Sequence, residues 1–331
     1  MNDKFLSHIE KKVLRGEEIT FSEAEELYRI DDNNIMPILS SASAITRKYR
    51  KDIVNLCAIT AARSGLCPED CAFCAQSMRH HTGLSVYPLI SEGEMLKKAE
   101  EAQKYSANRF CIVTSGRSVN EKELEVITRA IKKIKNKFPN LKVDASLGIL
   151  KAPEIEKLKA AGLDRYNHNL ETAESYFPRI CTTHTYAERM STIKLIKKAG
   201  IEICCGGIIG LGESNAQRIE LAFTLAELDI DSLPLNFLNP VPGTSLKDIH
   251  PPSPFNILKT IALFRFIIPK KEIRICAGRQ VNLRSIQPFI FMAGADAIII
   301  GNYLTTKGSE PQDDLKMLDD LGLSRIRGHS L

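Results

Sequence analysis

From about residue 51 onward, short stretches rich in β-branched residues alternate with longer amphipathic stretches. Runs of four to eight apolar residues indicate strands, and apolar residues recurring every three to four positions indicate helices. The pattern predicts eight strands, over 53–60, 109–114, 141–146, 165–170, 201–209, 232–238, 272–277 and 297–300. It predicts helices near 91–105, 120–138, 153–161, 185–199, 214–228, 254–268, 281–293 and 311–321. Alternating strands and helices indicate a parallel sheet, and eight units indicate an α/β fold of the closed (β/α)8 barrel type.

The first fifty residues have a different pattern, without strand signals. Amphipathic stretches predict three helices there, over 4–14, 20–28 and 40–51. Thr20 followed by Glu23 is a capping-box start, because each side chain can bond the other residue's backbone N–H. We therefore expect a helical extension over 1–50, followed by one barrel domain over 51–331.

Composition narrows the class of protein. The chain has 331 residues, of which 44% are hydrophobic and 26% charged, and its net charge of +5 arises from interspersed acids and bases. Such a weak, scattered charge does not indicate nucleic-acid binding, and no apolar run is long enough to span a membrane. Nine cysteines without an apolar signal segment indicate metal ligands in a reducing compartment rather than disulfides. We expect a cytoplasmic protein.

The run CPEDCAFC at residues 67–74 contains three of these cysteines and directly follows the first predicted strand. A structural zinc site usually takes two separated cysteine pairs, whereas this loop offers three thiolates and no local fourth ligand. Three thiolates can hold three irons of a four-iron cluster and leave the fourth iron open. With Phe73 before the last cysteine, the run resembles the CxxxCxΦC signature of the radical S-adenosylmethionine superfamily. A structural zinc loop and buried free thiols are the alternatives.

Polar residues are also predicted inside the barrel. Successive strand residues point to opposite faces, so Asn167, Asn169 and Glu171 share one face. Amides inside a barrel cost free energy unless they find partners, which predicts a polar ligand. Asn236 adds an amide from the sixth strand.

A glycine-rich run, GGIIGLGE at residues 206–213, ends the fifth strand. Its glycines allow a ligand to approach the backbone closely, although a Gly-rich turn without a ligand is the alternative. The run resembles the superfamily's GxIxGxxE element, and this resemblance implies that Gly206 and Ile208 contact the cofactor, as does Phe73.

The remaining cysteines fall mainly on predicted strands. Cys57, Cys111, Cys204 and Cys276 lie on four different strands, which predicts a second metal site; small core residues are the alternative. Cys205 must face away from Cys204. Arg109 shares a face with Cys111, and Arg274 with Cys276, so we expect two arginines to offset thiolate charge. Cys181, in the loop over 177–185, has no evident partner.

Taken together, these motifs resemble the biotin synthase family from about residue 53 to about residue 306. The matching runs are GLCPEDC at 65–71, YNHNL at 166–170, residues 204–213, AGR at 277–279, FMAGA at 291–295 and LTT at 304–306. The resemblance implies sulfur insertion into dethiobiotin, a 5′-deoxyadenosyl radical generated from S-adenosylmethionine, and a sacrificial second cluster as sulfur donor. It also implies a flavodoxin or ferredoxin reductant and a homodimer.

The resemblance further implies residue roles. Cys67, Cys71 and Cys74 would hold the 4Fe–4S cluster. Asn169 and Glu171 would reach the ribose of S-adenosylmethionine, with Glu171 standing where the family usually has aspartate. The substrate's ureido ring and carboxylate tail would be held by residues Asn167, Asn169, Asn236, Thr305 and Thr306.

The chain departs from the family at the second cluster. Cys111, Cys204 and Arg274 match three of the family's four donor-cluster ligands, which would make them catalytic, but the fourth position is Asp144. In exchange, two cysteines, Cys57 and Cys276, replace residues that are usually serine. Either the site is rebuilt on four cysteines or it is lost. We favour a site on four cysteines, because a site that had lost its function would not be expected to gain inward-facing thiols. Four thiolates can hold two or four irons.

Two other function classes stay open. A radical enzyme of the hydrogenase-cofactor or pyrrolysine pathways would share the barrel and the loop, but it would lack the inward asparagines. A non-catalytic iron–sulfur redox protein would leave those asparagines unexplained.

Overall fold

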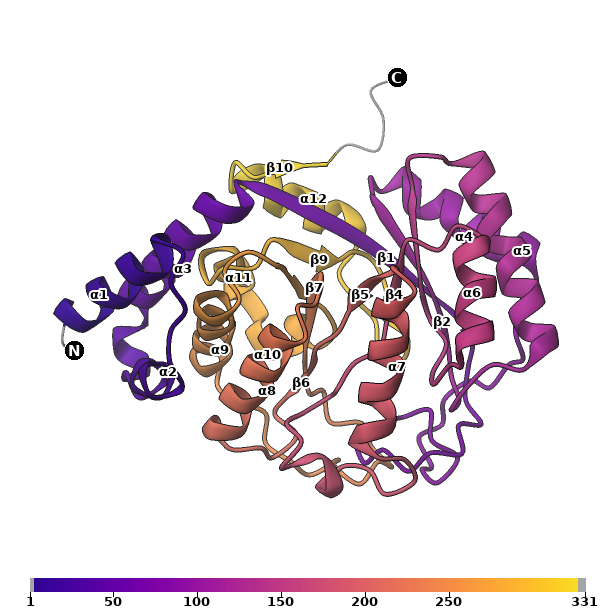
Figure 1. Ribbon diagram of the computed structural model, residues 1–331, viewed down its shortest axis with the longest axis horizontal. Helices are drawn as coiled ribbons and strands as arrows, with labels where there is room; N and C mark the ends of the chain where they lie inside the picture. Colours follow the sequence, from indigo (N-terminus) through magenta and orange to yellow (C-terminus); the bar gives the residue numbers. More distant parts are fainter. Residues whose placement is uncertain (1–2, 327–331) are drawn as a thin grey trace.

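The computed structural model describes residues 3–326 and folds them into a closed parallel barrel surrounded by helices (Figure 1). Its strands are β1 (Ile53–Arg63), β2 (Arg109–Thr114), β3 (Lys142–Ser146), β4 (Arg165–Asn167), β5 (Glu202–Cys204), β6 (Gly207–Ile209), β7 (Ser232–Phe237), β8 (Glu272–Ile275) and β9 (Ala297–Ile299). Pairing runs from β1 to β9 in order, and β1 closes the barrel on β9. The (β/α)8 prediction is confirmed. Short β10 (Ser324–Arg325) pairs with the start of β1.

The fifth barrel strand is interrupted, whereas the sequence predicts it as continuous over 201–209. Its halves, β5 and β6, both pair with β7. Pro234 of β7 has no N–H for a ladder hydrogen bond. A Cβ at Gly206 would lie 2.0 Å from the Pro234 carbonyl oxygen, so the two strands approach too closely there for a side chain.

The helices that cover the barrel follow the predicted positions closely. They are α4 (Glu92–Lys104), α5 (Glu121–Lys137), α6 (Ala152–Ala160), α7 (Tyr186–Lys198), α8 (Asn215–Glu227), α9 (Pro254–Ile267) and α12 (Pro311–Asp320). The helix predicted over 281–293 is broken into α10 (Arg279–Leu283), η3 (Arg284–Ile286) and α11 (Phe289–Met292). Arg284 has a φ of 53°, and Pro288 lacks an N–H, so one continuous helix cannot form.

Before the barrel come α1 (Asp3–Leu14), α2 (Phe21–Tyr28), η1 (Asp32–Asn34) and α3 (Ile35–Arg50), at the left of Figure 1. The capping box is confirmed: Thr20 Oγ1 accepts from Glu23 N at 3.2 Å, and Glu23 Oε2 accepts from Thr20 N at 2.6 Å. Helix α3 packs on α9, and α2 on α8. Residues 1–2 and 327–331, at the ends of the two predicted domains, lie outside the described residues.

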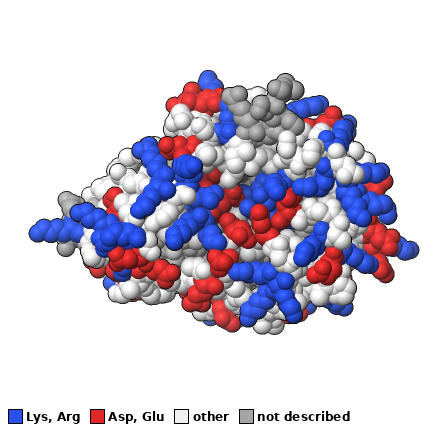
Figure 2. Space-filling model, turned by 45° about the horizontal axis from the view of Figure 1, so that its top comes forward, with Lys and Arg blue, Asp and Glu red and all other residues white. Residues whose placement is uncertain are grey.

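Surface charge and hydropathy add two observations. Figure 2 shows basic and acidic side chains interspersed over one face of the molecule. Across residues 3–326, no helix combines the length and apolarity that crossing a membrane requires.

Ion pairs join the strands near their N-terminal ends, and all of their members are buried except Glu202, whose side chain is 44% exposed. We call this group the floor ring; its members are Arg109, Asp144, Arg165, Glu202, Glu272 and Arg274. Arg109 bonds Asp144 at 2.9 Å and Glu202 at 3.0 Å. Arg165 bonds Glu202 and Glu272, both at 3.0 Å. Three guanidinium groups thus face three carboxylates, so the ring balances its own charge.

Glu272 is the most heavily bonded member of the floor ring. Its Oε1 accepts from Arg274 Nη2 and Ser232 Oγ, each at 2.6 Å, and its Oε2 accepts from Asn55 Nδ2 at 2.8 Å. Burial alone would raise the pKa of Glu272, but the charges of Arg274 and Arg165 hold that pKa well below its usual range. The carboxylate is therefore ionised and ties β1, β4, β7 and β8 together.

We predict that Glu272→Gln lowers the free energy of unfolding by about 3–5 kcal/mol, because it leaves buried arginines without their partner charge. Urea denaturation of the cluster-free protein measures this loss. Glu121→Gln is the control, because Glu121 is 77% exposed in its pair with Lys157 and its loss should cost less than about 0.5 kcal/mol. Equal effects of the two substitutions would contradict a structural role for the ring.

Candidate active site

A cavity of about 410 Å³ opens at the C-terminal end of the barrel, where catalytic groups of this fold gather. Twelve of the residues singled out from the sequence line it: Cys67, Cys71, Phe73, Cys74, Asn167, Asn169, Glu171, Ile208, Asn236, Cys276, Thr305 and Thr306. Residues nearly 240 positions apart in the chain therefore meet in one place.

The cysteine loop at 67–74, which we call the radical loop, is held by its own backbone. Cys67 N donates to Gln76 O at 3.1 Å, and Cys74 N donates to Cys71 O at 2.9 Å. The three sulfurs are not all within 4.8 Å of one another. One tetrahedral zinc ion would bring its thiolates closer together than this, so the loop as folded is not arranged around a single zinc ion.

Asn167, Asn169 and Glu171 share the cavity wall as expected, but His168 between them lines the cavity too, so strand alternation is not what places them. Strand β4 ends at Asn167, and Glu171 has a φ of 69°, so a turn rather than strand alternation keeps Glu171 on this wall. Arg189 Nη1 donates to the Asn169 carbonyl at 2.8 Å and lies 3.7 Å from Glu171 Oε1. Burial raises the pKa of Glu171, which Arg189 opposes.

The amides of the cavity are only partly satisfied. Asn167 Nδ2 donates to Cys111 Sγ at 3.3 Å, whereas its Oδ1 is buried and has no partner within residues 3–326. Asn236 Oδ1 accepts from Ala277 N at 3.1 Å. An unpartnered buried oxygen is costly, so Asn167 Oδ1 marks a place for a hydrogen-bond donor of a ligand.

Gly206 and Ile208 have different surroundings. Ile208 lines the cavity, but Gly206 does not. Gly206 N donates to Asn169 Oδ1 at 3.2 Å, and Gly206 O accepts from Glu171 N at 3.1 Å. The backbone of this glycine thus holds Asn169 and Glu171 in position. Direct contact between Gly206 and a cofactor stays a prediction.

Between the floor ring and the cavity lie four inward thiols, Cys57, Cys111, Cys204 and Cys276, which we call the thiol layer; each is at most 3% exposed. Strand register places Cys111 beside Asp144 and Cys204 beside Asn167. Burial raises the pKa of Cys57 to about 11 and raises those of the other three, so the metal-free thiols are protonated. Cys205 faces the apolar layer under the helices, as expected.

The two arginines expected to offset thiolate charge have different partners. The charge of Arg274 favours the thiolate form of all four cysteines, and that of Arg109 favours the thiolate form of Cys57. Arg109 also donates to both carboxylate oxygens of Asp144, at 2.9–3.2 Å. Arg274 bonds Glu272 but keeps a buried Nε without a partner among the described residues.

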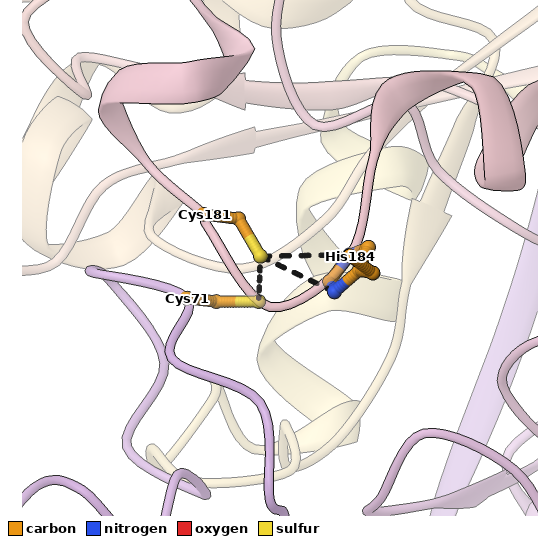
Figure 3. A group of neighbouring side chains, drawn as sticks. All are labelled: Cys71, Cys181 and His184. Atoms are coloured by element: carbon orange, nitrogen blue, oxygen red, sulfur yellow. Dashed lines mark hydrogen bonds between the residues drawn. The ribbon is translucent and has the colours of Figure 1, made fainter.

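Cys181 has partners that the sequence did not reveal. Its Sγ lies 3.8 Å from Cys71 Sγ and 3.2 Å from His184 Nδ1 (Figure 3). The Cys71 thiol donates to the Cys181 sulfur, which raises the pKa of Cys71 and lowers that of Cys181 to about 4. Cys181 does not line the cavity, so it lies behind Cys71. The three-residue spacing to His184 was the one available signal, and nothing in it points to Cys71.

Comparison with known proteins gives two family matches. A model described as "Radical SAM superfamily" matches residues 63–226, and one described as "Biotin and Thiamin Synthesis associated domain" matches residues 234–324. The chain is 48% identical over 314 residues to the biotin synthase of Geotalea uraniireducens (strain Rf4), covering 95% of each chain. It is 46% identical over 324 residues to that of Citrifermentans bemidjiense, covering 98% of each.

Solved structures share the fold at lower identity. Methylornithine synthase superimposes with a TM-score of 0.81 at 17% identity, over 97% of this chain and 98% of the other. The FeFe-hydrogenase maturase of Carboxydothermus hydrogenoformans gives a TM-score of 0.81 at 17% identity, over 97% and 79%. At such identity the likeness supports the fold alone.

Proposed function

The chain belongs to the biotin synthase family, and on this premise we propose that it inserts sulfur into dethiobiotin to form biotin, as a radical S-adenosylmethionine sulfurtransferase. The observation that carries the proposal is near-full-length identity of 46–48% to biotin synthases. The alternative of a related radical enzyme without sulfur insertion is not favoured, because its representatives share only the fold.

The cavity fits the cofactors of this reaction. Cys67, Cys71 and Cys74 would hold the 4Fe–4S cluster, and no fourth side chain of the radical loop competes for the open iron. Bound together, cluster and S-adenosylmethionine supply the radical that removes hydrogen from dethiobiotin. Asn169 and Glu171 would bind the ribose, with Arg189 fixing the orientation of both. Phe73 and Ile208 would exclude water on the apolar side.

The substrate would lie against the asparagine side chains that line the cavity. Asn167 Oδ1 offers an unpartnered acceptor for a ureido N–H, and Asn236 and Asn169 stand on the same cavity. Thr305 and Thr306 would receive the carboxylate tail through backbone N–H groups. Hydrogen bonds from a fixed wall orient the substrate, and orientation is what this chain contributes to the reaction.

The sulfur donor would be a second cluster held by the thiol layer. Cys57, Cys111, Cys204 and Cys276 all point into the barrel beneath the cavity, and Cys276 also lines the cavity. Asp144 is already bonded through both oxygens to Arg109, which makes it a poor fourth ligand. Arg274 Nε, free of a partner among the described residues, would donate to the bound cluster.

Three further features belong to this proposal. A flavodoxin or ferredoxin would deliver the electron at the groove beside the radical loop, where Leu66 and Val86 are 68% and 54% exposed. The protein would act in the cytoplasm as a homodimer, as its family resemblance implies. Residues 1–50 would form a helical extension, and 51–331 the catalytic barrel.

The first prediction concerns the radical loop. Changing Cys67, Cys71 or Cys74 to Ala should abolish reductive cleavage of S-adenosylmethionine, because a cluster held by two thiolates would not keep an open iron. Formation of 5′-deoxyadenosine under anaerobic reduction measures this. If any one of these variants cleaves S-adenosylmethionine at the rate of the unsubstituted protein, the assignment of these three cysteines as cluster ligands is wrong.

A second prediction concerns the substrate. Asn236→Ala should weaken dethiobiotin binding by about 1–3 kcal/mol, because a buried polar partner is left unpaired. Calorimetric titration of the reconstituted enzyme measures the affinity, and uncoupled cofactor cleavage should survive. Asn108→Ala is the control, because Asn108 is a buried amide bonded to Asn55 near the floor ring, outside the cavity. Unchanged affinity in Asn236→Ala would indicate a different substrate.

A third prediction concerns the donor. Alanine at Cys57, Cys111, Cys204 or Cys276 should remove the second cluster's iron and biotin formation, while the first cluster and cofactor cleavage persist. Iron and sulfide analysis with Mössbauer spectra of reconstituted protein measures both clusters.

The matched control is Cys205→Ala, which should keep two clusters. Asp144→Asn should also keep the second cluster's iron, although it should lower the free energy of unfolding because it removes a floor-ring charge. Cys205 is as buried as Cys204 but faces the opposite way. If Asp144→Asn strips the second cluster while Cys57→Ala and Cys276→Ala retain it, aspartate is the ligand and the four-thiol site is wrong.

A further inference from the structure

Two loops far apart in sequence are fastened together behind the radical loop. Ala72 N donates to Ile180 O at 2.8 Å, so the residues that follow Cys71 and precede Cys181 are joined backbone to backbone. On the other side, Asp70 Oδ1 accepts from Thr182 N at 2.9 Å and from Thr183 N at 3.2 Å. These bonds involve no cysteine sulfur, so they hold Cys71 and Cys181 together without a cluster.

The two sulfurs face each other within this frame, as Figure 3 shows. Their separation is 3.8 Å, and their side chains are 8% and 5% exposed. A disulfide requires a separation of about 2.0 Å, which small side-chain rotations reach when the backbones are already adjacent. Cys71 lines the cavity and so meets small solutes, whereas Cys181 lies behind it. His184 Nδ1, 3.2 Å from Cys181 Sγ, holds that sulfur in place.

We propose that Cys181 is a resolving cysteine for the radical loop: when the cluster is absent and hydrogen peroxide is present, Cys71 and Cys181 form a reversible disulfide. Peroxide oxidises the Cys71 thiol to a sulfenic acid and is reduced to water. The Cys181 sulfur then attacks the Cys71 sulfur, and the sulfenic oxygen leaves as a second water. Overall, two thiols and one peroxide give one disulfide and two waters. A dithiol reverses the bond by exchange and is itself oxidised to a disulfide.

The consequence for the enzyme rests on the proposed function, in which Cys71 is a cluster ligand. A sulfenic acid left unresolved is oxidised further to sulfinic acid, which is irreversible for most proteins. The disulfide would stop that oxidation and store the ligand in recoverable form. In cytoplasmic proteins disulfides of this kind are transient rather than structural.

Peptide mapping tests the bond directly. The full chain is stripped of iron, reduced with a dithiol that is then removed, exposed to a molar excess of hydrogen peroxide, alkylated and digested with trypsin. Cleavage after Arg63, Arg79, Arg179 and Arg189 releases residues 64–79 and residues 180–189 as separate peptides. We expect these two to be joined through Cys71 and Cys181, with Cys67 and Cys74 alkylated, and to separate on addition of dithiol.

The decisive variant is Cys181→Ser, which keeps the side-chain size. Its peptide 64–79 should gain two or three oxygen atoms at Cys71 that dithiol does not remove. Cys205→Ser, which changes an equally buried cysteine on the far side of the fifth strand, should behave as the unsubstituted chain. The proposal is overturned if peptides 64–79 and 180–189 are not joined, if the bond uses Cys67 or Cys74, or if Cys181→Ser protects Cys71 equally well.

Iron uptake separates this proposal from the proposed function. After peroxide and then dithiol, the unsubstituted chain should refill the radical-loop cluster, and Cys181→Ser should lose that iron. If the disulfide forms but refilling without dithiol is undiminished, Cys71 is not a required ligand. That outcome overturns the protective role of the disulfide and the assignment of Cys71 as a cluster ligand. The disulfide between Cys71 and Cys181 would still be established by the peptide map.

Discussion

The barrel depends on a set of charges of which all but Glu202 are buried. A buried carboxylate or guanidinium group is costly unless each is paired and hydrogen-bonded. The floor ring meets this condition across β2, β3, β4, β5 and β8, and Glu272 extends it to β1 and β7 through Asn55 and Ser232. A one-residue slip of any of these strands would send its charged residue toward the helices and leave its partners unpaired. We infer that the ring fixes strand register, and with it everything stacked above.

Strand register then determines which side chains point into the barrel at each level along its axis. Because side chains alternate, the position two residues beyond a floor-ring residue points inward again. Arg109 is followed by Cys111, Glu202 by Cys204, and Arg274 by Cys276. The layer of thiols is thus a direct consequence of the layer of charges, and the amides and the radical loop follow at the C-terminal ends. The floor ring, the thiol layer and the cavity therefore follow one another from the N-terminal to the C-terminal ends of the strands.

What the sequence predicted and what it missed follow the same physics. Strand positions, the inward face of Asn167 and the opposite directions of Cys204 and Cys205 depend on local periodicity, and the structure agrees with each. The interruption at Gly206 depends on Pro234 of a neighbouring strand. The pairing of Arg109 with Asp144 and of Cys181 with Cys71 likewise joins residues from separate segments. A single sequence carries no signal for such tertiary partners, although it does contain the residues.

The aspartate at position 144 links the floor ring to the proposed donor site. With Asp144 present, three arginines face three carboxylates; without it, one guanidinium charge would be left uncompensated inside the barrel. A cysteine at that position would have to balance the charge of Arg109 through a metal-bound thiolate. This chain instead balances the ring with its own carboxylates, and Asp144 has no oxygen free of Arg109. A donor site above a self-neutral ring must take its ligands from other strands, which is where Cys57 and Cys276 stand. If the proposed donor site is correct, Asp144 and the cysteines at positions 57 and 276 are parts of one electrostatic arrangement.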